Sequence, residues 1–288
     1  MTEQIFEEKL QLLVAMALQE DVGDGDHSTL SCIPASQMGH GVLKIKEDGV
    51  LAGVAVAERI FKIIEPAATL NMYKKDGDDM QFGETAFEVS ATVHTLLKAE
   101  RLVLNSMQRM SGIATLTRQY TNKLKGYKTK LLDTRKTTPN FRLLEKEAVK
   151  IGGAFNHRFG LYDMIMLKDN HIDFCGGIVK AIDKAYEYVQ QVKPGLKIEV
   201  ETRSLEDIRL AVGTGKVDRI MLDNFTLEQI VEGLKIIEDR CETEASGGIN
   251  LETIVAYAET GVTFVSVGGL IHQARSLDLS LKAKVSPF

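Results

Sequence analysis

Short apolar runs, each ending in a polar residue, recur along the second half of the chain and alternate with helix-like segments. They occupy residues 130–134, 164–168, 197–201, 219–223, 243–246 and 264–269. Strand and helix patterns that alternate in this way predict βαβ units around a parallel sheet. Because a polar side chain follows each strand, we expect these side chains to meet at the carboxyl-terminal face of a closed or nearly closed α/β barrel. A doubly wound open sheet would produce the same alternation.

The first part of the chain has a different pattern. Residues 5–20 place apolar side chains largely on one helical face, and residues 41–93 contain short β-like runs broken by Gly and Asp turns. Helical periodicity over residues 95–120 predicts a long connecting helix. We therefore expect a compact α+β domain followed by the barrel. The predicted boundaries are 1–112 for the first domain with its connecting helix, 113–270 for the barrel, and 271–288 for a C-terminal segment that packs back on the first domain.

Composition narrows the function classes. With 288 residues and 44% hydrophobic content, the chain can build one large barrel and a smaller companion domain. A formal net charge of −5 argues against a general binder of nucleic acid or membrane surfaces. Three cysteines without CxxC spacing disfavour a disulfide framework and a zinc site and favour a cytoplasmic location. No apolar run reaches membrane-spanning length, and the N-terminal residues lack the pattern of an export signal.

Positive side chains gather in one central segment, residues 133–171, where the chain changes direction repeatedly. They follow or end apolar runs, or lie in a Gly-flanked loop: Arg135, Lys136, His157, Arg158 and Lys168. Arginine offers a planar fork of donors that matches a carboxylate or a phosphate, and lysine offers a compact point charge. Adjacent cations in loops of an acidic chain predict a site for a multiply charged anion.

Other basic residues carry no such signal. Arg142, Lys146 and Lys150 recur at helical spacing, and we expect them to form one solvated helix face. His40 and His94 each stand alone in the sequence, and we expect both to be structural.

Two carboxylates, Glu201 and Asp223, end consecutive predicted strands and should lie side by side at the barrel mouth. Mg²⁺ is commonly held by one or two carboxylates together with substrate phosphate oxygens and water. We therefore predict that both residues serve a metal ion, with Asp223 also available to ribose hydroxyls. A structural salt bridge to Lys168 or Arg158 is the alternative. Glu199, two residues before Glu201, points the same way one layer deeper and is interpreted as structural.

Glycine-rich turns follow the last two predicted strands. They are Ser246-Gly247-Gly248 and Gly268-Gly269. Glycine lets backbone N–H groups approach a phosphate closely, and the loops after the last two strands of such barrels commonly bind one. Residues 249–259 look helical with Asn250 as the cap, so that a helix N-terminus would add a favourable dipole. The pattern predicts a phosphate site here.

An ordered set of motifs resembles the quinolinate phosphoribosyltransferase family: DTRKTTP, NHRFGLYDMIMLKDNH, IEVE, IMLDN and EASGGI. The resemblance extends from residue 17 to residue 281. It implies an α/β fold, a truncated TIM-like barrel of the type II phosphoribosyltransferase kind with an N-terminal α/β sandwich domain. Tyr162 with the Met-rich run 164–167, and Gly269 where the family often has Ala, depart from the pattern without removing a charged group.

The resemblance also implies an activity. A phosphoribosyl group would pass from phosphoribosyl pyrophosphate to quinolinate with decarboxylation, giving nicotinate mononucleotide, pyrophosphate and CO2 in de novo NAD biosynthesis. Displacement at the anomeric carbon builds positive charge on the sugar and negative charge on the departing pyrophosphate, which fixed cations and Mg²⁺ stabilise. Because such chemistry depends on positioning, we expect His157 to be an orienting donor and not an obligatory base.

Carried over by position, the resemblance gives the site residues their roles. The catalytic set is Lys136, His157, Lys168, Glu201 and Asp223, of which Glu201 and Asp223 would also serve Mg²⁺. The substrate-binding set is Arg101, Thr134, Arg135, Lys136, His157, Arg158, Lys168, Glu201, Asp223, Ser246, Gly247, Gly248, Gly268 and Gly269. Arg101 would complete the site of a neighbouring subunit, which implies a homodimer with shared sites and leaves a higher oligomer open. A solvent-facing helical arginine is the alternative for Arg101.

Three other functions are compatible with parts of the pattern. A related group of molybdenum-linked proteins shares this scaffold, although the intact Arg135–Lys136 and His157–Arg158 pairs favour the transferase. A Schiff-base aldolase could use Lys168 at a strand end, but such a lysine needs a neutral pocket. A non-catalytic anion-binding regulator would bind ligands without turnover.

Overall fold

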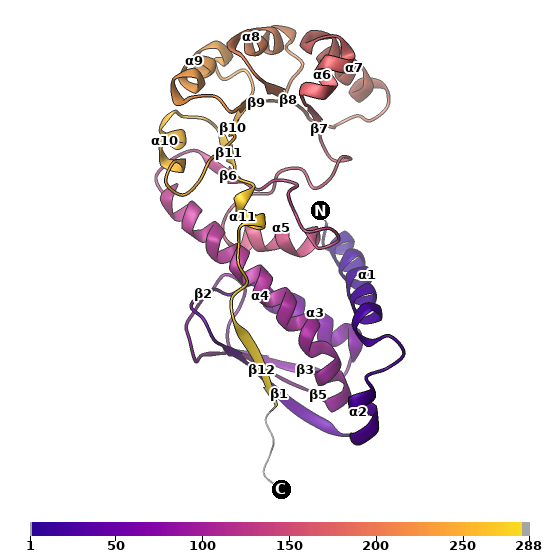
Figure 1. The fold of residues 1–288 in the computed structure, drawn as a ribbon. Coiled ribbons are helices and arrows are strands. Elements are labelled where there is room, and N and C mark those ends of the chain that lie inside the picture. The colour runs from indigo at the N-terminus through magenta and orange to yellow at the C-terminus, as the bar shows by residue number, and fades with distance from the viewer. Residues whose placement is uncertain (1, 284–288) are drawn as a thin grey trace. The chain divides into compact units, whose positions relative to one another are not determined.

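The computed structural model describes residues 2–283, and these form two compact units (Figure 1). The first unit contains residues 2–118, 137–153 and 270–283, and the second contains residues 119–136 and 154–269. The end of the predicted C-terminal segment, residues 284–288, lies outside the described residues. Within residues 2–283, no helix combines the length and the apolar character that crossing a bilayer requires.

A four-stranded antiparallel sheet forms the centre of the first unit. Its strand order is β12 (Leu279–Ala283), β1 (Met38–Ile45), β5 (Thr85–Thr92) and β3 (Thr69–Met72), and β2 (Gly49–Val50) pairs separately with β4 (Asp79–Met80). The helices of this unit are α1 (Glu3–Val22), α2 (His27–Cys32), α3 (Val54–Ile64), α5 (Arg142–Ile151), most of α4 (Val93–Lys123) and most of the short α11 (Gly269–His272). The long helix predicted over residues 95–120 corresponds to α4.

The apolar face of α3 contributes to the core of this unit. Val56, Ile60 and Phe61 are almost completely buried. Phe61 meets Phe87 of β5 edge to face, with ring centroids 6.4 Å apart. Such aromatic pairs stabilise a core beyond the area that they bury, so this contact fixes α3 on the sheet.

Helix α5 is more enclosed than its sequence pattern predicts. Lys146 is 1% exposed and Glu145 is 0% exposed, whereas Lys150 lies in solvent. Glu145 accepts hydrogen bonds from Arg109 Nε at 3.0 Å and from the Thr138 N–H at 2.7 Å. The expectation of a solvated face is therefore wrong for Lys146, because helical spacing shows which residues share a face but not which other segments cover that face.

A six-stranded parallel sheet forms the second unit. Its strand order is β6 (Lys130–Leu132), β11 (Phe264–Ser266), β10 (Glu242–Ser246), β9 (Arg219–Asp223), β8 (Ile198–Thr202) and β7 (Ile165–Leu167). In Figure 1 the strands follow an open arc, and its outer side carries α6 (Asp169–Cys175), α7 (Ile178–Gln191), α8 (Leu205–Thr214), α9 (Leu227–Ile237) and α10 (Ile254–Glu259). The truncated α/β barrel is confirmed. The doubly wound alternative is wrong, because it would place helices on both faces.

Burial along the strands explains why polar residues end them. Strands covered on both faces read as continuous apolar runs, and the strand end is the first position open to solvent. In β9 the residues before Asp223 are buried and Asp223, which ends the strand, is partly exposed. Ser246 ends β10 in the same way and is aligned with Asp223 across the sheet. In β8 Glu201 is partly exposed one residue before the strand ends at the buried Thr202, so the sequence placed this strand end one residue too early. The strand ends therefore form a shared polar rim.

Residues 249–253 form a turn and not the start of a helix. The Asn250 side chain accepts hydrogen bonds from the N–H groups of Glu252, at 2.9 Å, and Thr253, at 3.1 Å. Helix α10 begins only at Ile254. The helix predicted over 249–259 is therefore wrong at its start, because Asn250 caps a local turn.

Candidate active site

The strand ends of the second unit surround a pocket of about 380 Å³. Its walls contain nine residues predicted from the sequence: Thr134, Arg135, Lys136, His157, Arg158, Lys168, Glu201, Asp223 and Ser246. They also contain four residues that the sequence interpretation did not assign to the site: Met166, Met221, Glu244 and Ser266. A concave site of this size with convergent charged groups suits a small polar ligand.

Some predicted residues do not line this pocket. They are Gly247, Gly248, Gly268, Gly269 and Arg101. Gly247-Gly248 directly follows β10, and Gly268-Gly269 follows β11 after Val267, so both pairs lie close to pocket residues in the chain. Arg101 lies on α4 in the first unit, where its side chain is 70% exposed and its guanidinium is 4.0 Å from Glu100.

The turn after β10 requires glycine at one position. Gly247 has a φ of 105°, and a Cβ at this residue would lie 2.2 Å from Asn224 Oδ1. Asn224 donates its backbone N–H to the Ser246 carbonyl at 2.8 Å and its side-chain N–H to Asp223 Oδ2 at 2.7 Å. Asn224 thus ties the ends of β9 and β10 together and holds the Asp223 carboxylate beside Ser246.

Arg135 and Arg158 both line the pocket, and their charges repel each other. Burial lowers the pKa of Arg158, and the charge of Arg135 lowers it further. Arg158 Nη1 donates to the Met164 carbonyl at 3.3 Å. Arg135 Nε is buried without a hydrogen-bond partner among the described residues. An anionic ligand would neutralise these two neighbouring guanidiniums and accept hydrogen bonds from their N–H groups.

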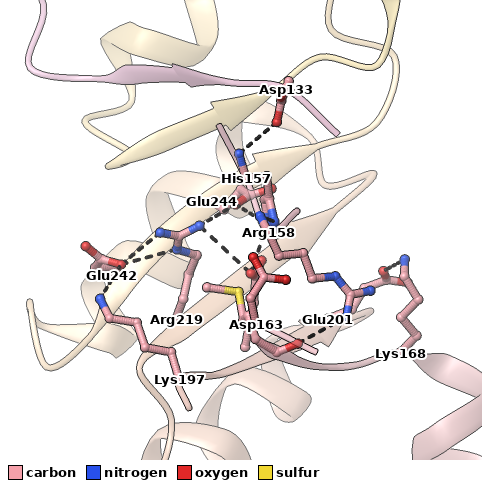
Figure 2. A network of polar contacts seen from close by, with 12 residues as sticks. Asp133, His157, Arg158, Asp163, Lys168, Lys197, Glu201, Arg219, Glu242 and Glu244 are labelled. Carbon is pink, nitrogen blue, oxygen red and sulfur yellow. Dashed lines mark hydrogen bonds and ion pairs between the residues drawn. The ribbon is translucent and has the colours of Figure 1, made fainter. Parts of the chain in front are cut away.

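Lys168 and Glu201 form an ion pair at the rim. Lys168 Nζ lies 2.7 Å from Glu201 Oε2, with the side chains 45% and 12% exposed, and Figure 2 shows this pair at one end of the polar network. The backbone N–H of Lys168 donates to His171 Nδ1 at 3.0 Å, which fixes the chain where α6 begins. The salt bridge that was the alternative for Glu201 is therefore present. A partly exposed pair of this kind costs little to open for a ligand.

Below the rim, the barrel interior contains a second group of charges, the interior cluster: His157, Glu199, Arg219 and Glu244. Both carboxylates are fully buried, and His157 Nε2 lies 3.0 Å from Glu199 Oε2 and 3.2 Å from Glu244 Oε2. Arg219 Nη1 lies 3.1 Å from Glu244 Oε2, and its Nη2 lies 2.9 Å from Glu242 Oε2 (Figure 2). Charges enclosed in this way are tolerated because they neutralise one another.

The contacts within the interior cluster shift the pKa values of its members. Burial alone would lower the pKa of His157, but its contacts with Glu199 and Glu244 raise the pKa to about 9. Burial and the charge of Glu244 also raise the pKa of Glu199. The Arg158 N–H donates to His157 Nδ1 at 2.7 Å, which requires a lone pair on that nitrogen. Because these buried groups interact strongly, the proton that they hold belongs to the coupled His157–Glu199 pair and not to one residue. The role of His157 as an orienting donor to a substrate stays a prediction.

Two aspartates that the sequence interpretation passed over hold the segment carrying Arg158. Asp133 Oδ1 accepts the backbone N–H of His157 at 2.8 Å (Figure 2). Asp163 accepts the backbone N–H groups of residues 159 and 160 at 2.6 and 2.8 Å. The available signal was an aspartate directly after a strand and another in a Gly-containing loop, both typical of side chains that bond to turn backbone.

Glu244 was also missed. It precedes Ser246 by two residues on β10, as Glu199 precedes Glu201 on β8. Because side chains two apart on a strand share a face, both glutamates lie one layer below the rim. The same offset that identified Glu199 as an interior residue would have identified Glu244.

Comparison with known proteins assigns the family. A sequence model of the quinolinate phosphoribosyl transferase C-terminal domain matches residues 113–282, and that of the N-terminal domain matches residues 26–111. The chain belongs to the quinolinate phosphoribosyltransferase family. The family suggested by the sequence motifs is therefore confirmed.

Relatives of this quinolinate phosphoribosyltransferase family member align over nearly the whole chain. The chain is similar to a chloroplastic nicotinate-nucleotide pyrophosphorylase (carboxylating) of Arabidopsis thaliana. The two are 42% identical over 288 residues, and the alignment covers 95% of this chain and 82% of that protein. A probable nicotinate-nucleotide pyrophosphorylase (carboxylating) of Bacillus subtilis is 41% identical over 278 residues, 96% and 94% of the two chains. The crystal structure of NadC from Streptococcus pyogenes is 42% identical, with a TM-score of 0.88 and coverage of 98% and 97%.

Proposed function

We propose that this protein transfers the phosphoribosyl group of phosphoribosyl pyrophosphate to quinolinate and releases CO2, giving nicotinate mononucleotide and pyrophosphate in de novo NAD biosynthesis. The observation that carries the proposal is one pocket in which Arg135, Arg158 and Lys168 meet the carboxylates Glu201 and Asp223. A dianionic acceptor needs the cations, and a metal-bound phosphoribosyl donor needs the carboxylates. The names of the Arabidopsis and Bacillus relatives support the same reaction.

The cations would bind quinolinate and orient its ring nitrogen. We assign its two carboxylates to the guanidiniums of Arg135 and Arg158, because each fork can bind a carboxylate with two hydrogen bonds. Lys136 and Lys168 add point charges for quinolinate and for the pyrophosphate of the donor. Met166 and Met221 supply apolar wall in the same pocket, and a thioether suits contact with an aromatic ring.

Glu201 and Asp223 would hold Mg²⁺ with the phosphoribosyl donor. The donor set fits this ion, because both residues offer hard oxygen atoms at the partly exposed rim. When bound, Mg²⁺ would supply charge for the departing pyrophosphate. Ser246 and the glycine turns after β10 and β11 would bind the 5′-phosphate through backbone N–H groups.

The chemical work of the protein residues is positioning and charge stabilisation. Fixed cations lower the energy of pyrophosphate as negative charge develops on it, while the aligned ring nitrogen attacks the anomeric carbon. The attack gives a cationic pyridine ring. That ring accepts the electron pair of the adjacent C–CO2 bond as CO2 leaves, so the carbon that loses CO2 needs only a proton from solvent.

Arg101 would complete the site of a partner subunit in a homodimer, a role supported by its exposed position on α4 and by the sequence resemblance. We also retain as proposals a cytoplasmic location and the domain boundaries at 1–112, 113–270 and 271–288.

The aldolase alternative requires a neutral amine at Lys168. The Lys168 ammonium instead lies 2.7 Å from the Glu201 carboxylate, and two arginines line the same pocket. A nucleophilic lysine is activated by surroundings that disfavour its charge, and this ion pair favours it. The geometry therefore supports the transferase over the aldolase.

The function is tested by incubating the purified protein with quinolinate, phosphoribosyl pyrophosphate and Mg²⁺ and following nicotinate mononucleotide by chromatography. We expect Mg²⁺-dependent product and its loss in Arg158→Met. Binding of both substrates without turnover would support an anion-binding regulator instead. Trapping of a carbonyl substrate on Lys168 by borohydride would support the aldolase.

A further inference from the structure

The interior cluster is connected to the pocket through the His157 ring. On one side of the ring, Nε2 faces the buried carboxylates of Glu199 and Glu244 at 3.0 and 3.2 Å. On the other side, Nδ1 accepts the backbone N–H of Arg158 at 2.7 Å. His157 is 8% exposed, so the surroundings determine the ring orientation. The ring therefore links a buried charge pair to the backbone of a pocket arginine.

Arg219 anchors this arrangement in the barrel. Its guanidinium lies 3.1 Å from Glu244 and 2.9 Å from Glu242, and its Cζ is 4.2 Å from the centroid of the Phe264 ring. The contacts of His157 and Arg219 thus reach strands β8, β9, β10 and β11. Groups supported by several strands of a barrel hold their positions better than groups supported by a loop alone.

We propose that Glu199, Glu244 and Arg219 are positioning residues, which fix the His157 ring and through it the Arg158 backbone, so that the Arg158 guanidinium meets a carboxylate of the acceptor. This inference rests on the proposed function, in which Arg158 binds quinolinate. Arg158 lies in the segment between α5 and β7, and its neighbour His157 donates its backbone N–H to Asp133. The interior cluster adds contacts that hold the His157 ring itself.

A bound metal ion is the competing explanation of the same atoms. His157 Nε2 and one oxygen each of Glu199 and Glu244 lie within 4.8 Å of one another, a set that could hold a cation. Arg219 already brings a positive charge to 3.1 Å from Glu244. A second cation in the same fully buried space would have to overcome this repulsion, which favours the positioning role.

The chain offers a matched pair of variants for the test. Glu244→Gln removes the charge that contacts both His157 and Arg219. Glu242→Gln removes a charge from the same strand and the same Arg219, but its side chain is 38% exposed and the pocket walls do not include it. Quinolinate and phosphoribosyl pyrophosphate binding are measured separately by calorimetry, and hydrogen exchange of the Arg158 amide is followed by NMR.

We expect Glu244→Gln to raise the quinolinate Kd about 10-fold or more, because small displacements of an orienting group are costly. The Kd of phosphoribosyl pyrophosphate should change by no more than about twofold, as for an independent site. The Arg158 amide should exchange about 10-fold faster in Glu244→Gln, because its acceptor is no longer held in place. Glu242→Gln should leave all three quantities close to those of the wild type.

The proposal is overturned if both variants weaken quinolinate binding alike, if neither does, or if Glu244→Gln weakens both substrates equally. One equivalent of a tightly bound transition metal in the wild type, lost in Glu244→Gln, would also overturn it. If Glu244→Gln fails to fold, Glu199→Gln carries the same expectations. Exchange of the Arg158 amide needs no substrate, so it tests the positioning role even if quinolinate proves not to be the acceptor.

Discussion

The rim and the interior cluster occupy adjacent layers of the same strands but hold their charges differently. At the rim, Lys168 is 45% exposed and pairs with Glu201, and Asp223 is bonded by an asparagine side chain. One layer below, Glu244 is fully enclosed and contacts both a histidine and an arginine. Charges at the rim remain accessible to a ligand, whereas the interior charges are enclosed and lie against charges of opposite sign. Side chains only two residues apart on a strand can therefore have different functions: those at the rim are placed to bind substrate, and those below it support the site.

The largest effect should come from the rim cations and their preference for two carboxylates. Nicotinate carries one carboxylate, so it would leave an arginine or lysine unpaired in a desolvated site. A site built to bond a polar group can reject an analogue that lacks it by about 10⁴-fold. Competition kinetics should therefore show a kcat/KM for quinolinate that exceeds that for nicotinate by this order. Comparable turnover of nicotinate would contradict the acceptor assigned to the rim.

Removing a charge from the interior cluster should lower the free energy of unfolding far more than removing a charge from the rim. Arg219→Met leaves buried carboxylates without their cation, and breaking a buried pair in this way costs about 3–5 kcal/mol. Lys168→Met removes the cation of a partly exposed pair and should change the free energy of unfolding by less than about 1 kcal/mol. Urea unfolding of the two variants measures both values. Similar losses for the two variants would remove the distinction between the layers.

The rim carboxylates should matter for the phosphoribosyl donor and not for quinolinate. Glu201→Gln and Asp223→Asn should each lower kcat/KM by about 10²-fold to 10³-fold, because charge that develops on pyrophosphate loses its metal partner. Quinolinate binding, measured by calorimetry without the donor, should change little. Lost quinolinate binding with unchanged Mg²⁺ dependence would show that these carboxylates serve the acceptor.

A site shared between subunits would be a further difference between rim and interior. The rim would include Arg101 of the partner subunit, whereas the interior cluster would consist of residues of one chain. Mixing inactive Arg101→Ala and Lys168→Ala subunits should restore about a quarter of the sites after random exchange in a symmetric dimer. Lys168→Ala mixed with Asp223→Asn is the matched control, since both residues line the same pocket of one chain and hybrids contain no intact site. Equal activity from the two mixtures, with exchange verified, would exclude the role of Arg101 in the partner site.

The smallest effect should be a pH dependence of stability that comes from the interior. The folded pKa of His157 is raised from 6.5 to about 9 by the two glutamates, so the stabilising proton is fully present below pH 6.5 and is lost as the pH approaches 9. The free energy of unfolding of the wild type should therefore fall over this range. In Glu244→Gln the fall should be smaller, and an identical slope would show that the interior cluster does not retain the proton.

The sequence predicts the rim better than the layer beneath it. Apolar runs that end in Lys168, Glu201 and Asp223 show both the strands and the positions where solvent begins, so the fold and these pocket residues follow from local pattern. Glu244 lies inside a run rich in polar residues, and its partners come from other strands. Such pairings depend on register, which one sequence does not display.

Two further errors have the same origin. The spacing of Lys146 shows a helix face but not the segments that cover it. Asn250 is as well suited to a local turn as to a helix cap, and the choice depends on the path that the chain takes after β10.

The most direct test of the central claim uses quinolinate labelled with carbon-14 in the carboxylate next to the ring nitrogen. If the pocket performs transfer with decarboxylation, the purified protein with phosphoribosyl pyrophosphate and Mg²⁺ should release labelled CO2, pyrophosphate and nicotinate mononucleotide in equal amounts. Label in the other carboxylate should remain in the nucleotide. Release of label without nucleotide, nucleotide that keeps both carboxylates, or no product from folded protein would contradict the account.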